Sequence, residues 1–306
     1  MRVVHGSERF GREVRGVITI GNFDGVHLGH RRLLEVLIET AGQRDAPSCV
    51  YTFEPAPQRV LRPESCPPRI LPLGEKLRLL GEAGVDIVVI EAFSVELGQN
   101  PPQWFAHEIL ESRLDPVAMV VGYDFRYGNE RAGDIDLLRQ QLPELPIDAV
   151  EALVLEDGTT VSSSRIRESV ATGDLHRASE LLGRPFHLRG TVIEGEARGR
   201  ALGFPTANIS REGELLPPPG VYAVEARVVD GELRPAVANL GVRPTFEGSR
   251  LSIEVHLLDF EGDLYGERMD VLFRERLRGE RRFENVGALK RQVEKDIQAA
   301  RAILTR

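Results

Sequence analysis

The sequence predicts an α/β domain with a Rossmann-like parallel sheet, followed by a small antiparallel β-barrel with a C-terminal helix. In the first half, short apolar runs alternate with amphipathic stretches of helical period. From about residue 185, strand-like segments follow one another with turns rich in Gly and Pro between them. The length of 306 residues suits two domains of roughly 150 residues. We therefore expect domains at 1–184 and 185–306.

The first half contains five predicted strands and four predicted helices. We expect the strands at 17–20, 48–53, 85–91, 116–125 and 147–156. We expect the helices at 31–42, 74–84, 101–114 and 134–142. Strands that alternate with helices over short links form a parallel sheet with helices on both faces. Such sheets bind ligands at the carboxyl ends of their strands.

The second half contains a short predicted helix, five predicted strands and a final helix. The short helix is expected at 173–183, and the amphipathic final helix at 286–304 should cover one face of the barrel. The strands are expected at 187–195, 220–231, 233–241, 251–260 and 267–277.

The net charge of −8 argues against nucleic acid and anionic membranes as partners, because proteins that bind them present a basic surface. A phosphorylated small molecule stays compatible with this charge, since such ligands are bound locally. Cys49 and Cys66 form neither a metal spacing nor a disulfide framework. The N-terminus lacks the apolar core of a signal peptide, and no apolar run approaches the roughly 18–20 residues that cross a bilayer. We expect a cytoplasmic protein, and the sequence gives no indication of an oligomer.

The first motif with chemical content is GNFDGVHLGH, Gly21 to His30, which follows a strand and opens a helix. Gly21 and Gly25 permit a tight turn with close backbone approach. His27 and His30 are three residues apart, so their rings face the same side of the first helical turn. With the helix N-terminus they form a pocket that neutralises a triphosphate, as adenylyl transfer requires. The alternative is a surface turn with two unrelated histidines, or part of a metal site.

A second polar cluster, VSSSRIR at 161–167, follows the fifth predicted strand. Its serines are typical helix-capping residues, and Arg165 and Arg167 would then be solvated. The functional interpretation is that hydroxyls, backbone amides and one arginine hold phosphates opposite the two histidines.

The motifs of the first half resemble the adenylyltransferase module of prokaryotic bifunctional riboflavin kinase/FAD synthetases. GNFDGVHLGH, YTFEPAP, VGYDFRYGNERAGD and VSSSRIR occur in the order seen there. That module is similar to HxGH nucleotidyltransferases and transfers AMP from ATP to FMN. The resemblance implies catalysis by His27 and His30. It implies ATP binding by Gly21, Phe23, Asp24, Gly25, His27, His30, Asp124, Ser163, Ser164 and Arg167, and flavin binding by Phe53, Pro55 and Phe125.

One position departs from the pattern of that family. After the second strand the family usually reads T-F-x-P-H-P, whereas this chain reads Thr52 to Pro57 with Ala56 in place of His. Alanine has neither a charge nor a side-chain hydrogen bond to offer. If the usual His helps to hold phosphate, adenylyl transfer here is slower or weaker for ATP.

The second half has its own cluster, in the segment 190–209. No GxxxxGK[ST] motif is present, but Gly195 and Gly199 permit a loop that closes over phosphates. Thr206 and Asn208 are two residues apart, so in extended backbone their oxygens point the same way, and such ligands suit Mg²⁺. An Asn-stabilised turn after a proline is the structural alternative. Glu254, at an inward strand position near a metal site, would be a candidate general base, although a solvated glutamate is the alternative.

PTAN, NLGVRPTF and IEVHLLDFEGDLYGE resemble the riboflavin kinase module of the same family in order and spacing. The resemblance implies that Thr206 and Asn208 bind Mg-ATP and that Glu254 is the catalytic base for the riboflavin 5′-hydroxyl. It implies a nucleotide-covering loop with Gly195, Gly199 and Arg200. Glu194 stands where the family often has His.

Both resemblances together predict an enzyme that converts riboflavin to FMN and then FMN to FAD, with ATP as co-substrate and Mg²⁺ as the ion. Flavins would be substrates rather than redox cofactors. The alternatives are an active riboflavin kinase with an impaired or purely binding and regulatory N-terminal module, and a nucleotidyltransferase for a different acceptor. A nucleotidyltransferase for a different acceptor would leave the barrel motifs PTAN and IEVHLLDF without a function.

Overall fold

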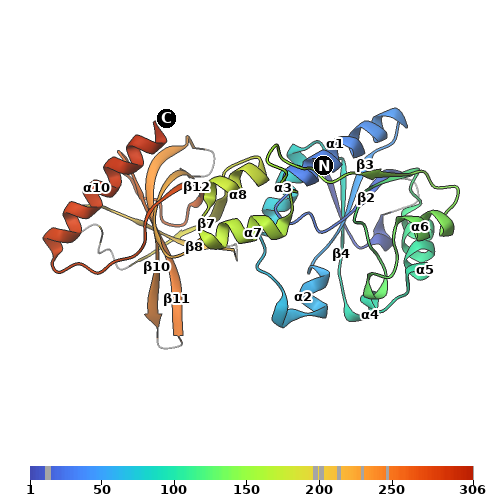
Figure 1. Cartoon of the computed structure of the whole chain (residues 1–306), viewed down its shortest axis with the longest axis horizontal. Helices are drawn as coiled ribbons and strands as arrows, with labels where there is room; N and C mark the ends of the chain where they lie inside the picture. Colours follow the sequence, from blue (N-terminus) through green and yellow to red (C-terminus); the bar gives the residue numbers. More distant parts are fainter. Residues whose placement is uncertain are drawn as a thin grey trace. The chain divides into compact units, whose positions relative to one another are not determined.

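The computed structural model describes residues 1–10, 15–195, 199, 203–211, 215–228, 231–245 and 248–305. The chain divides into two compact units, Met1–Ser163 and Ser164–Arg306 (Figure 1). The first unit contains a parallel sheet with flanking helices, and the second contains a closed antiparallel barrel. The predicted fold class is confirmed in both units.

The sheet of the first unit has six strands in the order β1-β4-β3-β2-β5-β6, and each neighbouring pair is parallel. The chain fills β3 and β4 on one side of β2 before it crosses to β5 on the other side. The order therefore reverses between β2 and β5, the place where ligands bind in open α/β sheets. The strands are β1 Arg2–His5, β2 Val17–Ile20, β3 Ser48–Phe53, β4 Ile87–Glu91, β5 Ala118–Gly122 and β6 Ile147–Val150.

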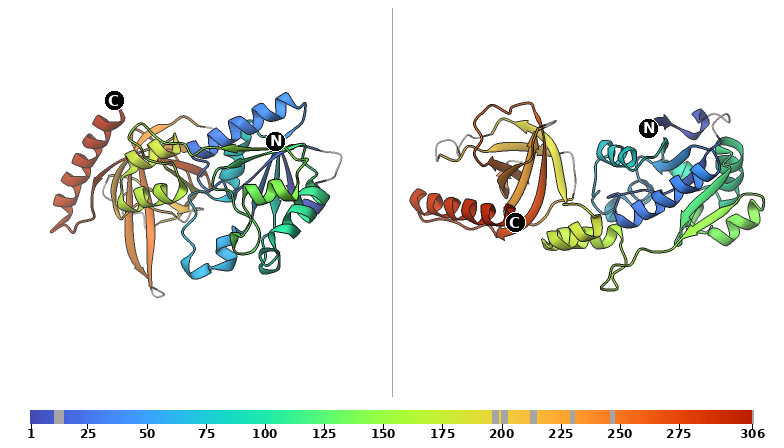
Figure 2. Two further views of the ribbon diagram at one scale, coloured as in Figure 1. Left: turned by 45° about the vertical axis from the view of Figure 1, so that its right-hand side comes forward. Right: turned by 90° about the horizontal axis from the view of Figure 1, so that it is seen from above.

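Helices cover both faces of this sheet because alternate strand residues are buried on opposite sides. Leu34 and Leu37 of α1 lie on one face, where α1 crosses β2, β3 and β5 (Figure 2). On the other face, Ile109 and Leu110 pack in one cluster with Tyr51. The helices are α1 Leu28–Gln43, α2 Pro57–Leu61, α3 Leu73–Glu82, α4 Val95–Gly98, α5 Pro102–Trp104, a π-helix Phe105–Leu114 and α6 Ile135–Gln141. Short 3-10 turns lie at Ser7–Arg9, Pro63–Ser65 and Asn129–Arg131.

Sequence reasoning missed one strand of this unit and extended two others too far. β1 was not predicted, because its four residues include two charged or titratable side chains and only Val4 is buried. The predicted strands 116–125 and 147–156 end in the structure at Gly122 and Val150. The residues after these ends turn into the loops that form the site described below.

The second unit begins with two helices and continues into the barrel. All neighbouring pairs in the order β10-β11-β8-β7-β12-β9 are antiparallel, and β9 pairs with β10 to close the barrel. The elements are α7 Ser163–Thr172, α8 Leu175–Leu182, β7 His187–Ile193, β8 Ala207–Arg211, β9 Gly220–Val228, β10 Arg234–Thr245, β11 Gly248–Leu257, β12 Arg268–Arg278 and α10 Val286–Leu304. β8 was not predicted, because it is short and begins within the loop-like sequence FPTAN.

Side chains of the barrel strands alternate between the interior and an outer face. Tyr222, Val255 and Phe273 are fully buried inside. On the outer face, Val221 and Val237 form a second small cluster with Ala300 of α10. The amphipathic final helix therefore covers part of the outer barrel wall, as predicted (Figure 1).

Three charged side chains form a row on another part of the outer wall. Asp270 is 6% exposed and accepts hydrogen bonds from Arg189 Nε at 2.5 Å and Nη2 at 2.7 Å. Arg227 Nη2 donates to the same carboxylate at 3.3 Å. Burial alone would raise the pKa of Asp270, but the hydrogen bonds and charge of Arg189, with His187 and Arg227, lower it below its usual value.

Replacing Asp270 by alanine should lower the free energy of unfolding of the barrel unit by about 3 kcal/mol near neutral pH, because half of a largely buried ion pair is lost. The folded-state pKa lies below the unfolded value of roughly 3.9, so this contribution is fully present above that pH and is lost as the pH falls through the folded-state pKa. Thermal unfolding of wild type and variant at about pH 7 and about pH 3.5 checks this. Equal differences in Tm at both pH values would contradict it.

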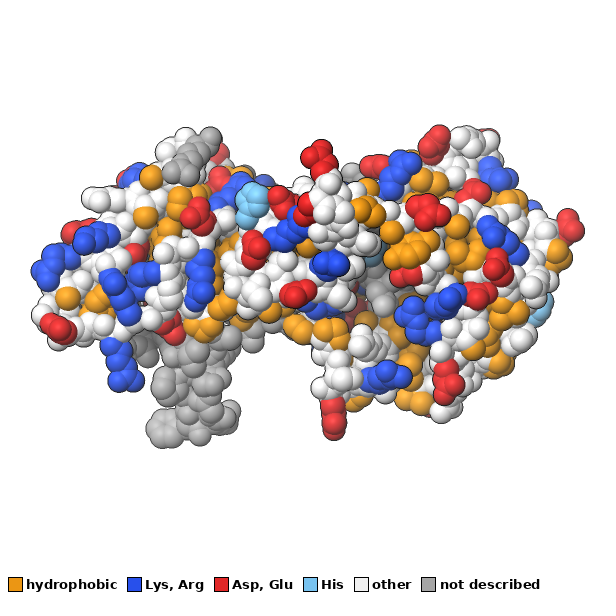
Figure 3. Space-filling view, viewed as in Figure 1, with side chains coloured by type: hydrophobic (Ala, Val, Ile, Leu, Met, Phe, Trp, Pro, Cys, Tyr) orange, Lys and Arg blue, Asp and Glu red, His pale blue; other side chains and the backbone are white. Residues whose placement is uncertain are grey.

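None of the helices in the described part of the chain has an apolar stretch that could cross a bilayer. On the face drawn in Figure 3, lysine and arginine side chains lie among acidic ones over both units.

Candidate active sites

The turn after β2 has an unusual backbone that its surroundings hold in place. Phe23 and Val26 have positive φ angles of 49° and 38°, and Gly25 has a φ of 90°. The Asp24 carboxylate accepts hydrogen bonds from the backbone N–H groups at 70 and 71, at 3.0 and 3.3 Å from Oδ1. Ser163 Oγ donates to the carbonyl oxygen of Asp24 at 2.8 Å. Asp24 therefore shapes the turn, and Ser163 fixes it from the other end of the unit's sequence.

The two histidines lie together at the start of α1. Their rings are stacked, with centroids 3.6 Å apart and 14° between the planes. His27 is 6% exposed and caps the helix, because its Nδ1 accepts from the backbone N–H of His30 at 3.2 Å. An Nδ1 that accepts carries no proton, so the neutral His27 ring has its proton on Nε2. A β-carbon on Gly29 would lie 3.2 Å from His27 Nδ1, so glycine gives this ring its room.

A cavity of about 290 Å³ opens beside this pair, at the carboxyl ends of β2, β5 and β6. It lies at the reversal of strand order, as expected for this sheet. Its lining is Ile20, Gly21, Phe23, His27, Gly29, His30, Leu33, Gly122, Tyr123, Asp124, Phe125, Val150, Glu151, Ala152, Leu153, Val161, Ser162 and Ser163.

The structure brings seven of the predicted residues together in this lining. They are Gly21, Phe23, His27, His30, Asp124, Phe125 and Ser163. Asp24 and Gly25 belong to the same turn without lining the cavity. Ser164 and Arg167 lie on the first turns of α7, in the second unit. Their role in ATP binding stays a prediction.

Phe53 and Pro55, which the YTFEPAP motif predicts to bind flavin, lie at and just after the end of β3 and do not line this cavity. The ring of Phe53 packs edge to face against Tyr51 at 5.2 Å and Phe93 at 5.6 Å. Pro55 follows after a cis peptide bond. Ala56 is the N-cap of α2 and forms no side-chain cap bond. The flavin-binding role of Phe53 and Pro55 also stays a prediction.

Sequence reasoning missed two parts of the cavity wall. Tyr123 is 51% exposed at the cavity although it is a large aromatic residue. Residues 151–153 follow β6, whereas the sequence pattern predicts that the strand continues through them. Both segments directly follow a strand of the parallel sheet, and this position could have marked them as part of the site. The apolar runs in the sequence, however, do not show where these strands end.

In the barrel unit, three polar residues are directly opposite one another on adjacent strands. Glu254 of β11 pairs with Asn208 of β8 on one side and with Asn239 of β10 on the other. Such cross-strand neighbours have Cβ atoms about 5 Å apart. Ile253 and Val255 on the same strand point into the interior. The expected inward position of Glu254 is therefore wrong: its half-buried side chain lies on the outer face of the barrel.

The two glycines of the predicted loop lie against the two predicted metal ligands. A β-carbon on Gly195 would lie 2.0 Å from Asn208 Nδ2, and one on Gly199 would lie 3.0 Å from Thr206 Oγ1. Only glycine permits this approach of the backbone. Arg200, predicted to bind ATP, lies outside the described residues.

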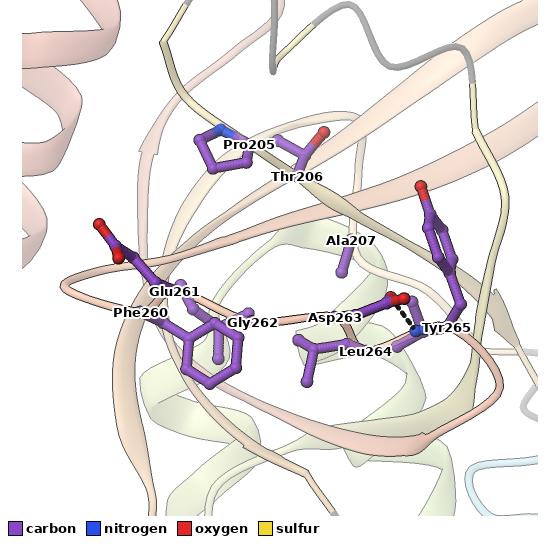
Figure 4. A pocket seen from close by; sticks show the side chains of 11 residues that line it. Pro205, Thr206, Ala207, Phe260, Glu261, Gly262, Asp263, Leu264 and Tyr265 are labelled. Carbon is purple, nitrogen blue, oxygen red and sulfur yellow. Dashed lines mark hydrogen bonds between the residues drawn. The ribbon is translucent and has the colours of Figure 1, made fainter.

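A second cavity of about 290 Å³ lies beside Thr206 (Figure 4). Its wall combines apolar groups such as Val192 and Leu257 with the loop 260–265. Within that loop, Asp263 Oδ1 accepts a hydrogen bond from the backbone N–H of Tyr265 at 3.0 Å. Asn239 and this loop belong to the motifs NLGVRPTF and IEVHLLDFEGDLYGE, whose pattern alone assigns no role to these residues.

Comparisons with known proteins match both units. Residues 12–165 match the family model for FAD synthetase, and residues 182–304 match that for riboflavin kinase. A bifunctional riboflavin kinase/FMN adenylyltransferase of Pseudomonas fluorescens is 42% identical over 99% of this chain and 98% of its own length. The protein of that name in Escherichia coli K12 is 41% identical, with 93% of this chain and 91% of the relative covered.

One solved structure is similar over nearly the whole length. A protein described as a macrolide-efflux protein of Streptococcus pneumoniae has a TM-score of 0.90 at 29% identity, and the similarity covers 98% of this chain and 99% of that one. Both units are thus covered by the similarity to this structure. Since full-length relatives share up to 42% identity and both family models match, the chain belongs to the family of bifunctional riboflavin kinases/FMN adenylyltransferases.

Proposed function

We propose that the chain makes FAD in two ATP-dependent steps at two separate sites. Riboflavin and ATP give FMN and ADP at the barrel, and FMN and a second ATP give FAD and pyrophosphate at the parallel sheet. The observation that carries this proposal is that each unit combines its own polar cluster with its own cavity. The ranges of the two family models support 1–184 and 185–306 as the corresponding domains.

Adenylyl transfer needs a site that orients two substrates and neutralises growing negative charge on pyrophosphate. The α1 N-terminus provides backbone N–H groups and a positive dipole end. His27 and His30 line the cavity beside it. We assign them to the ATP phosphates, and we assign Asp124 and Phe125, which line the same cavity, to the nucleoside and flavin. The phosphate of FMN attacks the α-phosphorus of ATP, so no covalent enzyme intermediate is required.

Phosphorylation of riboflavin needs a base near the 5′-hydroxyl and an oxygen-rich place for the triphosphate. Glu254 is the carboxylate in the row of three polar residues, and we assign it to accept the hydroxyl proton. The cavity beside Thr206 is assigned to ATP. Gly195 and Gly199 let the backbone lie against Asn208 and Thr206.

The side-chain oxygens at and just before β8 are suitable ligands for Mg²⁺. The Thr206 hydroxyl and the Asn208 amide carbonyl are hard oxygen ligands, and Gly199 and Gly195 let the backbone lie close against these two side chains. In the described part of the chain, no group of three or more His, Cys, Asp or Glu side chains is arranged to hold a metal. Such a site suits an ion that keeps waters and binds substrate phosphates. The ion would neutralise charge on the transferred phosphoryl group.

Product chromatography after incubation with riboflavin, ATP and Mg²⁺ tests the proposal. FAD should form through transient FMN, which would show both activities and the tolerance of Ala56. Accumulation of FMN without FAD would favour the second candidate function, an active kinase with an impaired first module. Ala56→His should then restore FAD formation. If riboflavin stays unchanged, the assignment of the barrel is wrong.

A further inference from the structure

The chain uses lysine very sparingly. Of its 39 lysines and arginines, only Lys76, Lys290 and Lys295 are lysines. The last two are exposed on α10. Lys76 on α3 is 7% exposed, and no other lysine or arginine of the described ranges is buried to this extent. The interior of the first unit therefore holds a lysine in a chain that elsewhere relies on arginine.

The ammonium group of Lys76 joins two segments of the adenylyltransferase unit. Nζ donates a hydrogen bond to the carbonyl oxygen of Asn22 at 3.3 Å and another to Thr52 Oγ1 at 3.2 Å. Asn22 belongs to the turn that follows β2, between the cavity-lining residues Gly21 and Phe23. Thr52 is fully buried near the end of β3. Lys76 thus lies behind the turn, where it connects the turn to the neighbouring strand.

This position is costly for a cation. Burial lowers the pKa of Lys76, while the charges of Glu54 and Asp24 oppose this effect and that of Arg69 adds to it. The two oxygens that accept hydrogen bonds from Nζ, the Asn22 carbonyl and Thr52 Oγ1, are both neutral. A buried ammonium with neutral partners destabilises a fold compared with an apolar side chain of similar length. Packing alone therefore does not explain why a lysine stands here.

A compact ammonium suits this place better than a guanidinium. Its donors are arranged around one atom, so the carbonyl of a turn residue and the hydroxyl of a strand residue can be reached together. The planar fork of arginine is built for paired oxygens on one group. The turn itself has positive φ angles at Phe23, Gly25 and Val26, a conformation that persists only where the surroundings fix it.

We propose that Lys76 is a positioning residue for adenylyl transfer, which fixes the turn of residues 21–25 through Asn22 and places a positive charge behind the triphosphate. It does not contact substrate. The inference rests on the proposed function, because it concerns the ATP site of the same unit. Charge so placed stabilises negative phosphate oxygens without reorganisation during the reaction.

Lys76→Met tests this proposal, because methionine keeps the unbranched stem and removes the charge and the donors. The kcat/KM of FMN adenylylation for ATP should fall by about 10- to 100-fold, as expected for lost hydrogen bonds from a charged group. Riboflavin phosphorylation by the same molecule should not change. The Tm should stay equal or rise. Unchanged adenylylation or a lower Tm would overturn the proposal.

Two further variants separate charge from shape. Lys76→Arg keeps the charge, so its adenylylation should exceed that of Lys76→Met, and equal losses would overturn the role of the charge. Lys290→Met removes an exposed lysine and should leave both activities unchanged. If wild type forms no FAD, the proposed function fails. In that case the affinity for pyrophosphate, measured by calorimetry, tests the role of Lys76. Lys76→Met should bind pyrophosphate more weakly than wild type, and equal affinities would overturn the proposal.

Discussion

Replacing Glu254 by alanine should lower riboflavin phosphorylation by about 100- to 10,000-fold, the range expected for loss of a general base. Adenylylation of added FMN by the same variant should keep its wild-type rate. The reason is local: Glu254 lies on the outer barrel face opposite Asn208 and Asn239, and the FMN site is assigned to the other unit. Separate assays with riboflavin and with FMN as the starting substrate measure both rates.

Glu275→Ala is the matched control for this experiment. Glu275 is an exposed glutamate on β12 of the same barrel, so its loss should change neither activity. Glu254→Gln adds a variant of the same size that cannot accept the proton. Loss of both activities in Glu254→Ala, with an unchanged Tm, would contradict the two-site assignment. A kinase rate close to wild type in Glu254→Gln would contradict the role as base.

His30→Ala should produce the opposite pattern. Adenylylation should fall by about 100- to 1,000-fold, the usual effect of removing one donor from a site that stabilises an oxyanion. Phosphorylation of riboflavin should continue and FMN should accumulate. The substitution leaves the backbone N–H of His30 in place, so the cap bond to His27 Nδ1 can persist. Chromatography of the products formed from riboflavin shows this accumulation directly.

The control for His30 is His176→Ala. His176 lies on α8 with a side chain 86% exposed, so its removal should affect neither product. A second check is the unfolding temperature of His30→Ala, because the ring of His30 stacks on His27 and lies 5.1 Å from Phe23. FAD formation at the wild-type rate in this variant would remove His30 from the reaction. Loss of riboflavin phosphorylation would refute separate sites.

The sequence was sufficient for the fold class and for the motifs at strand ends, since these depend on local periodicity and residue type. GNFDGVHLGH follows β2 and opens α1, and seven predicted residues line one cavity. Strand boundaries were less accurate, because apolar residues continue past the last sheet hydrogen bond in 147–156. β8 was missed because a five-residue strand after a proline has too little alternation to be read.

Other features of the sites depend on which strands and helices lie side by side in three dimensions, and the sequence alone does not show this. The outer position of Glu254 follows from the closure of the barrel, because alternation gives two faces but does not say which is inside. Asn239 is placed beside Glu254 only by the register of β10 and β11. Lys76 is brought behind the turn by α3, far from the motif in sequence. No local pattern marks it, since buried and exposed lysines look alike in a sequence.

The scarcity of lysine also bears on chemical labelling. Amine-directed dyes and cross-linkers acylate accessible primary amines, and Lys76 is shielded from them by burial. Lys290 and Lys295, both exposed on α10, would carry the side-chain labels in the folded protein. Side-chain labels introduced in this way would therefore report from one helix on the barrel wall, apart from any label on the exposed α-amine of Met1.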